Sequence, residues 1–200
     1  MKRAILLLVW VLCGCASELS QQSRDLLKQG TDFALTRDRG ILFGEECGGG
    51  AIEFRAKSFE GSALTSGGIL PSYKWLSDQR KLFIISLPAG EYQIPYLETF
   101  EGHTLDLKPA YRVVVSPGKA TYIGALYPSW FFHATRDEEK ACRSEWRRAI
   151  MTLCARKINM IGSNECWDVY VLDRASVAVD GLKEAFPNVD LSNYASGIPK

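Results

Sequence analysis

The chain has 200 residues, of which 46% are hydrophobic and 24% charged, and its formal net charge is +1. This length is sufficient for one domain with a hydrophobic core. No long basic run is present, so the chain lacks the electrostatic footprint of a nucleic-acid-binding protein. The one local basic cluster is interrupted by Glu145 and is typical of a solvated helix face; it contains Arg143, Arg147, Arg148, Arg156 and Lys157.

The first fifteen residues have the pattern of an export signal. Met1-Lys2-Arg3 precede an apolar run from Ala4 to Leu12, which is too short for a bilayer span of about 20 residues. The run ends in Leu12-Cys13-Gly14-Cys15, whereas ordinary signal peptides end in an Ala-x-Ala-like site. A plain secretory signal with incidental cysteines is the alternative interpretation.

The segment from Leu12 to Cys15 resembles the lipobox of bacterial lipoproteins. The resemblance implies cleavage before Cys15 and attachment of a diacylglyceryl group, with acyl chains such as palmitate, to its thiol. Two or more acyl chains anchor a protein stably, since each buried CH₂ contributes ~0.8 kcal/mol. Ala16, rather than Asp, follows Cys15, and the resemblance therefore favours the outer membrane, facing the periplasm. The expected membrane contact is through the N-terminal lipid.

Removal of the signal defines the expected organisation of the chain. Residues 1–14 are the signal peptide, residues 15–39 a lipidated polar tether, and residues 40–200 the folded domain, with a helical insertion at about 131–166. Loss of Lys2 and Arg3 leaves 22 basic against 23 acidic side chains, a net charge of −1.

Four cysteines remain once Cys13 is removed and Cys15 is lipidated. An even number in an exported protein predicts two disulfides. No pair has Cys-x-x-Cys spacing, and only His103 and His133 offer imidazole ligands, so a zinc site or a thioredoxin-like enzyme is disfavoured. No metal or other cofactor is expected. The disulfide candidates are Cys47, Cys142, Cys154 and Cys166.

From residue 40 the chain predicts short β-strands separated by turns. Apolar and β-branched runs predict strands at 41–43, 51–57, 81–87, 104–107, 111–115 and 120–126. A glycine-rich loop is expected at 44–50 and a long surface loop at 60–79. Ser116-Pro117-Gly118-Lys119 between two strands predicts a hairpin. This spacing is typical of an antiparallel β-sandwich.

Residues 142–158 predict an amphipathic helix, because apolar side chains recur there at three- and four-residue steps. On such a helix Cys142 and Cys154 would lie about 18 Å apart, whereas a disulfide needs Cα atoms within about 7 Å. Each of the two must then pair with Cys47 or Cys166. A return loop at 159–165 would bring Cys166 back to the helix end, which favours Cys154–Cys166 with Cys47–Cys142. A strand follows at 167–172, and a final helix at 176–186 ends at Pro187.

Two segments carry a family resemblance. Residues 83–94 (FIISLPAGEYQI) and 111–126 (YRVVVSPGKATYIGAL) resemble the transthyretin-like, or prealbumin-like, β-sandwich modules of bacterial surface proteins. They look closest to lipoproteins of the DUF2846 type, in which a Leu-Pro-Ala-Gly-x-Tyr turn precedes a Gly-Lys-x-Tyr-Tyr-Ile-Gly-like strand. Pro88 is expected to end strand pairing, Gly90 to permit the turn, and Tyr92 to pack its ring while its hydroxyl reaches a backbone group.

The residues do not predict a reaction. No Gly-x-Ser-x-Gly elbow occurs. The adjacent carboxylates Glu45 and Glu46 are expected at the solvated surface, pointing to opposite faces of a strand. We therefore expect a non-enzymatic, lipid-anchored envelope protein whose disulfide-stapled β-sandwich meets a protein or envelope partner that the sequence does not identify.

Two alternatives remain open. The first is a carbohydrate- or peptidoglycan-binding module that uses exposed aromatic side chains of Tyr127, Trp130 and Phe131. Burial of the same side chains beneath the predicted helix would leave only the partner-binding interpretation. The second alternative is a hydrolase with an unrecognised site.

Overall fold

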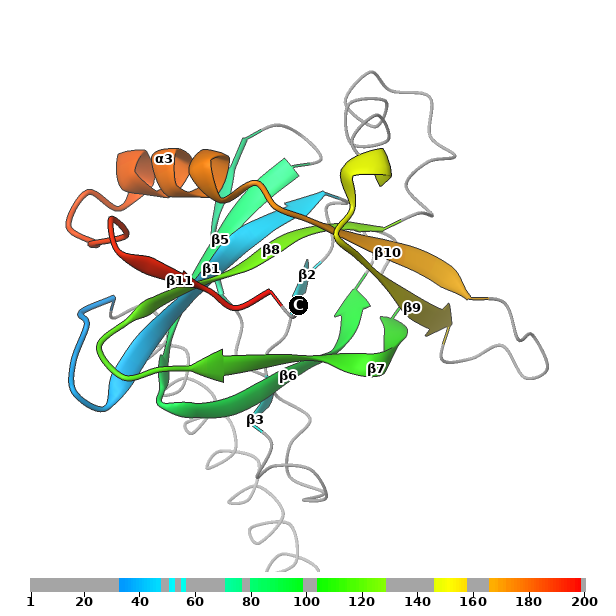
Figure 1. Ribbon diagram of the computed structural model, residues 1–200, viewed down its shortest axis with the longest axis horizontal. Coiled ribbons are helices and arrows are strands. Elements are labelled where there is room, and N and C mark those ends of the chain that lie inside the picture. Colours follow the sequence, from blue (N-terminus) through cyan, green and yellow to red (C-terminus); the bar gives the residue numbers. More distant parts are fainter. Residues whose placement is uncertain are drawn as a thin grey trace, which may run out of the picture.

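A computed structural model describes residues 33–47, 51–52, 55–56, 71–76, 80–98, 104–128, 146–157 and 166–198. These residues are mainly β and form one curled mixed sheet with one α-helix (Figure 1). The elements in chain order are β1 (Arg39–Cys47), β2 (Ala51–Ile52), β3 (Arg55–Ala56), β4 (Ser72–Trp75), β5 (Arg80–Pro88), β6 (Gly90–Glu98), β7 (Thr104–Val115), β8 (Ala120–Pro128), the 3₁₀ turn η3 (Trp146–Arg148), β9 (Met151–Lys157), β10 (Trp167–Leu172), α3 (Ala175–Ala185) and β11 (Tyr194–Ser196).

The strands follow the order β2-β6-β7-β9-β10-β8-β1-β5-β4, with β3 also on β6 and β11 also on β8. β8 runs parallel to β1 and β11, and the other pairs are antiparallel. The hairpin of β9 and β10 joins a half formed by β5, β1 and β8 to a half formed by β6 and β7. The sheet therefore curls so that one face of each half lies toward the other (Figure 1).

The space between the two halves holds the larger hydrophobic cluster, the inner core. The long strands all contribute side chains to it, and along β5 they alternate, with Phe83, Ile85 and Leu87 on the inner face. Its members are Leu42, Ile52, Phe83, Ile85, Leu87, Tyr92, Ile94, Leu97, Leu107, Tyr111, Val113, Val115, Ile123, Leu126, Leu153, Ala155, Val169 and Val171.

The opposite face of β1, β5 and β8 is covered by α3 and the segment after it (Figure 1). The apolar side chains between them form the outer core. This covering explains why β1 is buried on both faces. The outer core contains Ile41, Phe43, Leu82, Ile84, Ala120, Tyr122, Ala175, Ala178, Val179, Leu182, Val189 and Leu191.

Several local predictions are confirmed. Helix α3 lies within one residue of the expected range and precedes Pro187. β5 ends at Pro88, and the Tyr92 hydroxyl donates to the Pro88 carbonyl at 3.0 Å while its ring packs in the inner core. The turn at 117–118 is present, with Gly118 at φ +65°.

The predicted hairpin around that turn is wrong. β7 pairs with β6 and β9, whereas β8 pairs with β1, β10 and β11. The turn instead takes the chain from one half of the sheet to the other. A turn motif determines local chain reversal, but the partner of each strand depends on distant residues.

The predicted helix at 142–158 is also wrong over most of its described part, in which Trp146–Arg148 forms a single 3₁₀ turn. Met151–Lys157 is strand β9, an internal strand between β7 and β10, so this segment completes the sheet and is not a helical insertion. Leu153 and Ala155 face the inner core, which is the alternation of a strand. A short apolar run can fit both the helical period and the strand period. Here the pairing of β9 with two neighbouring strands prevails over the helical pattern.

Two expected loops contain strands. β1 continues through residues 44–47, and Ser72–Trp75 forms β4 within the expected loop at 60–79. Gly44 is needed in β1 because a Cβ there would lie 2.4 Å from the Gly124 carbonyl oxygen, at the register shift between β1 and β8. Gly124 has φ +104° at the same irregularity.

Candidate functional site

The most unusual buried group in the described residues is the carboxylate of Glu45. It lies on β1 on the same side as Phe43 and Cys47, facing the outer core, and it is completely shielded from solvent. An isolated carboxylate in such a place would be very costly. Its presence therefore requires charged and hydrogen-bonding partners.

Three side chains from distant parts of the chain meet that requirement. The Arg80 Nε donates to Oε1 at 2.7 Å and its Nη2 lies 2.6 Å from the same oxygen. The Tyr127 hydroxyl also donates to Oε1, at 2.9 Å, and the Arg174 Nε donates to Oε2 at 3.0 Å. Both carboxylate oxygens thus accept charge-assisted or phenolic hydrogen bonds. We call Glu45, Arg80, Tyr127 and Arg174 the Glu45 network.

The sheet brings these residues together at the ends of three strands. Arg80 begins β5 and lies opposite Cys47 in the pairing with β1, two positions from Glu45. Tyr127 is at the end of β8. Arg174 lies between β10 and α3, where its backbone N–H donates to the Tyr122 hydroxyl at 2.8 Å. The Glu45 network therefore connects the start of α3 to the middle of the sheet.

The tyrosines of this region are held as hydrogen-bond donors. Burial, followed by the charge of Glu45, raises the pKa of Tyr127, and burial is also the main cause of the raised pKa of Tyr122. A protonated Tyr127 can continue to donate to Glu45 at all ordinary pH values. The Arg80 and Arg174 side chains are 21% and 14% exposed, so they lie between the carboxylate and solvent. The Glu45 network therefore links β1, β5, β8 and the start of α3.

A second buried ion pair lies on the opposite face of the same strand. Glu46 points toward the inner core, and its Oε2 is 3.1 Å from the Lys81 Nζ of β5, with the two side chains 2% and 3% exposed. The Oε2 atom does not have good hydrogen-bond geometry in this contact. Burial raises the pKa of Glu46 to about 7, although the charge of Lys81 opposes this rise.

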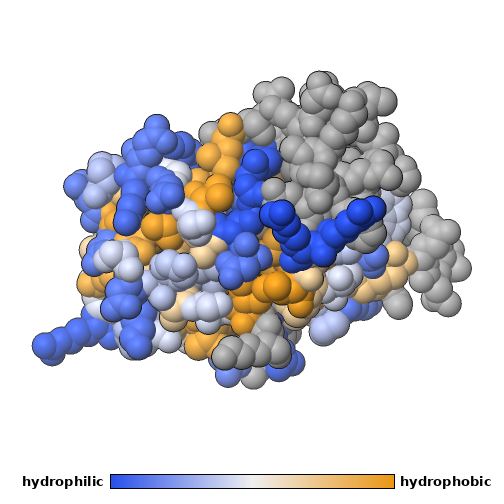
Figure 2. All heavy atoms as spheres, turned by 45° about the horizontal axis from the view of Figure 1, so that its top comes forward, coloured by the Kyte–Doolittle hydropathy of each residue, from blue (hydrophilic) through white to orange (hydrophobic). Residues whose placement is uncertain are grey.

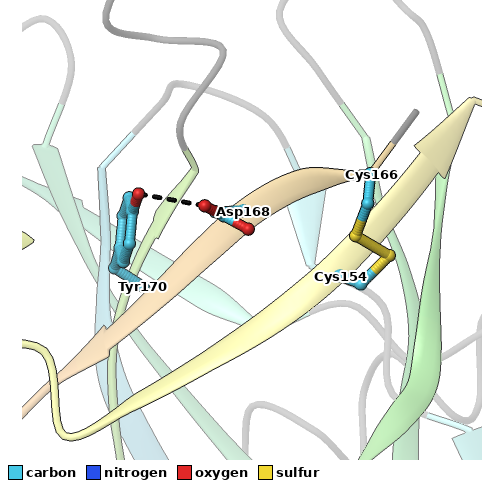
Figure 3. The surroundings of a disulfide bond; sticks show 4 residues. All are labelled: Cys154, Cys166, Asp168 and Tyr170. Atoms are coloured by element: carbon cyan, nitrogen blue, oxygen red, sulfur yellow. Dashed lines mark hydrogen bonds between the residues drawn. A yellow bond between two sulfur atoms is a disulfide. The ribbon is translucent and has the colours of Figure 1, made fainter.

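A disulfide joins Cys154 of β9 to Cys166, just before β10 (Figure 3), and Cys154 points away from the inner core that its neighbours Leu153 and Ala155 face. Cys154 and Cys166 are bonded, with Cα atoms 5.4 Å apart, and the nearby Tyr170 hydroxyl donates to Asp168 at 3.1 Å. The predicted pairing of Cys154 with Cys166 is confirmed, although the helix from which it was argued is absent. Cys47 is also disulfide-bonded. Cys142 lies outside the described residues, so its pairing with Cys47 stays a prediction.

Replacing Cys154 and Cys166 together by serine is expected to lower the free energy of unfolding by about 3 kcal/mol, because the bond closes a loop of 12 residues in the unfolded chain. Urea denaturation followed by circular dichroism measures the change. Equal stability of the double variant and the wild type would show that the hairpin does not depend on the bond.

Two predictions about polar surface are corrected. Glu45 and Glu46 do point to opposite faces, as expected, but both are buried and neither is solvated. Tyr127 is 1% exposed and bonded to Glu45, so it is not part of an exposed aromatic surface. Continued alternation of side chains past Phe43 could have placed Glu45 on a buried face. Nothing in the sequence indicates Arg80 or Arg174 as its partners.

The remaining site predictions fall elsewhere. Cys15, Trp130 and Phe131 lie outside the described residues. Within the described ranges, no group of three or more His, Cys, Asp or Glu side chains is arranged to hold a metal ion. No helix among the described elements is long and apolar enough to cross a membrane.

Comparison with known proteins found no matching family model, no similar curated protein and no similar solved structure.

Proposed function

We propose that this chain is a non-enzymatic lipoprotein of the bacterial cell envelope, held at the outer membrane by lipid on Cys15 and facing the periplasm. The observation that carries the proposal is the segment Leu12-Cys13-Gly14-Cys15 after a short cationic and apolar start. The disulfide between Cys154 and Cys166 is independent support, because disulfides persist in oxidising compartments such as the periplasm.

The proposal includes the finer fold, a transthyretin-like β-sandwich of the kind in DUF2846-type lipoproteins. Two features support it. The inner core lies between a half with β1, β5 and β8 and a half with β6 and β7. The Pro88–Tyr92 turn, which lies in the segment that carries the resemblance, has the hydrogen bond expected from its residues.

The domain's task in this proposal is to present a rigid surface to a protein partner in the envelope. The Glu45 network and the Cys154–Cys166 disulfide support such rigidity, because they join strands and helix covalently or through buried charges. The face turned forward in Figure 2 has both hydrophobic and hydrophilic areas over the described part.

The aromatic glycan-binding alternative has less support, because Tyr127 is buried. Retention of the purified domain on peptidoglycan tests it. Loss of retention in Trp130→Ala and Phe131→Ala variants would favour glycan binding through these aromatic side chains, whereas unchanged retention would count against it. Crosslinking in intact membranes, followed by pull-down, would then identify that partner.

The lipid anchor is tested by two matched variants. We expect Cys15→Ser to move the protein from the membrane fraction to the soluble periplasmic fraction, because the variant has no thiol to carry acyl chains. Cys13→Ser should remain in the membrane fraction, since Cys13 leaves with the signal. Fractionation and immunoblotting measure both outcomes. Retention of Cys15→Ser in the membrane fraction would contradict the proposal.

A further inference from the structure

In the part of the chain that the structure describes, the side chain of Tyr73 joins the two ends of the curled sheet. β2 ends the strand order on one side and β4 ends it on the other. The Tyr73 hydroxyl of β4 accepts from the backbone N–H of Ile52 in β2 at 3.0 Å and donates to the Ile52 carbonyl at 3.4 Å. A side chain thus supplies the bonds that a neighbouring strand would supply. We call the contact between Ile52 and Tyr73 the seam.

A buried ion pair lies directly behind the seam. The Lys81 Nζ is 4.2 Å from the centroid of the Tyr73 ring, a cation–π contact, and 3.1 Å from the Oε2 of Glu46. Lys81 is paired in register with Glu46 on one side and with Trp75 of β4 on the other. Any change in the charge of Glu46 therefore acts on the cation that supports Tyr73.

Among the described residues, Lys81 is the charged group that faces Glu46. β4 contributes Tyr73, which reaches the pair through Lys81, and β8 contributes the apolar Leu126 opposite Glu46. The adjacent acid, Glu45, points to the outer face, where it has its own arginine partners. The protonation of Glu46 is thus governed by its burial and by Lys81.

We propose that Glu46, Lys81 and Tyr73 form a pH-sensitive lock, which holds the seam closed while Glu46 is protonated and loosens it when Glu46 is ionised. Opening the seam would admit water to the end of the inner core that contains Ile52 and Phe83. The lock would let the domain change between a closed and a locally open state over the pH range of the envelope.

The direction follows from linkage. Burial raises the pKa of Glu46 to about 7 in the closed state, from an ordinary value of 4.5 when the carboxyl is solvated. The closed state therefore binds the proton more tightly than the open state does. The free-energy advantage of the closed state is fully present below pH 4.5, the ordinary pKa of the carboxyl, and is lost as the pH rises through about 7.

Hydrogen exchange on the full-length protein tests the lock. We expect the protection of the Ile52 amide, corrected for intrinsic exchange, to fall at least tenfold between about pH 5 and pH 8, since each pKa unit corresponds to a factor of ten. Low urea should hardly change this protection, because a local opening exposes little surface. The amide of Ile41, bonded to the Lys119 carbonyl at the far end of β1, is the control for global unfolding.

Two variants sharpen the test. Glu46→Gln keeps the shape of the neutral acid, so protection should stay high and flat across the pH range. Lys81→Met removes the positive charge that stabilises the ionised carboxylate and lowers the pKa of Glu46, so the midpoint of the fall should move to higher pH. The lock is overturned if Glu46→Gln keeps the wild-type pH dependence, if Lys81→Met leaves the midpoint unchanged, or if Ile52 and Ile41 exchange with the same protection and urea dependence.

Discussion

Replacing Glu45 by alanine is expected to lower the free energy of unfolding by about 3–5 kcal/mol, the usual cost of removing one partner from a buried charge group. The variant leaves two arginines and the Tyr127 hydroxyl without the carboxylate that they share. It also releases Arg174, which immediately precedes α3. Urea denaturation should show the loss, and hydrogen exchange should show it early in α3.

Matched variants separate this effect from simple loss of a contact. Tyr127→Phe removes only one hydrogen bond to a charged group and should cost about 2 kcal/mol. Glu184→Ala breaks an exposed ion pair with Lys74 and should leave stability unchanged. If Glu45→Ala is as stable as Glu184→Ala, then the Glu45 network does not hold α3 on the sheet.

The second large effect is expected at Gly44. A Cβ at this position would lie 2.4 Å from the Gly124 carbonyl oxygen and 2.6 Å from the Phe83 ring. Because a backbone oxygen within a sheet cannot move aside without breaking the ladder, Gly44→Ala should cost about 3 kcal/mol. Denaturant unfolding measures the change.

Gly181→Ala is the matched control for this prediction. Its Cβ would also meet an atom at 2.4 Å, but that atom is the terminal Cδ1 of Leu82, a flexible side chain. Gly181 also lies in α3, where alanine is favoured over glycine by about 1 kcal/mol. We therefore expect a much smaller loss. Equal losses at the two positions would contradict the close approach of β1 and β8.

The elements that sequence predicts well are those determined by neighbouring residues. β5 is a continuous apolar run stopped by Pro88, and α3 combines a helical apolar face with Pro187 beyond its end. The Pro88–Tyr92 turn forms the expected bond within five residues. In each case the secondary-structure propensity of the residues, their hydrophobic pattern and their turn chemistry favour the same local structure.

The features that sequence could not predict depend on long-range pairing. Met151–Lys157 fits a helical period, but β7 and β10 on either side make it a strand. Glu45 and Glu46 are polar residues beside glycines, which is typical of a loop, yet arginines and a lysine far away in the chain allow their burial. Cys154 shows the same limit, because its correct partner was inferred from a helix that does not form.

Mass spectrometry of the mature protein tests the proposed function most directly. The purified membrane form should begin at Cys15 and carry a diacylglyceryl group on that residue. Without reduction, the peptides of Cys154 and Cys166 should be joined, as should those of Cys47 and Cys142. An unmodified N-terminal peptide, or one that begins at any residue other than Cys15, would contradict the proposal that this domain is held in the envelope by lipid.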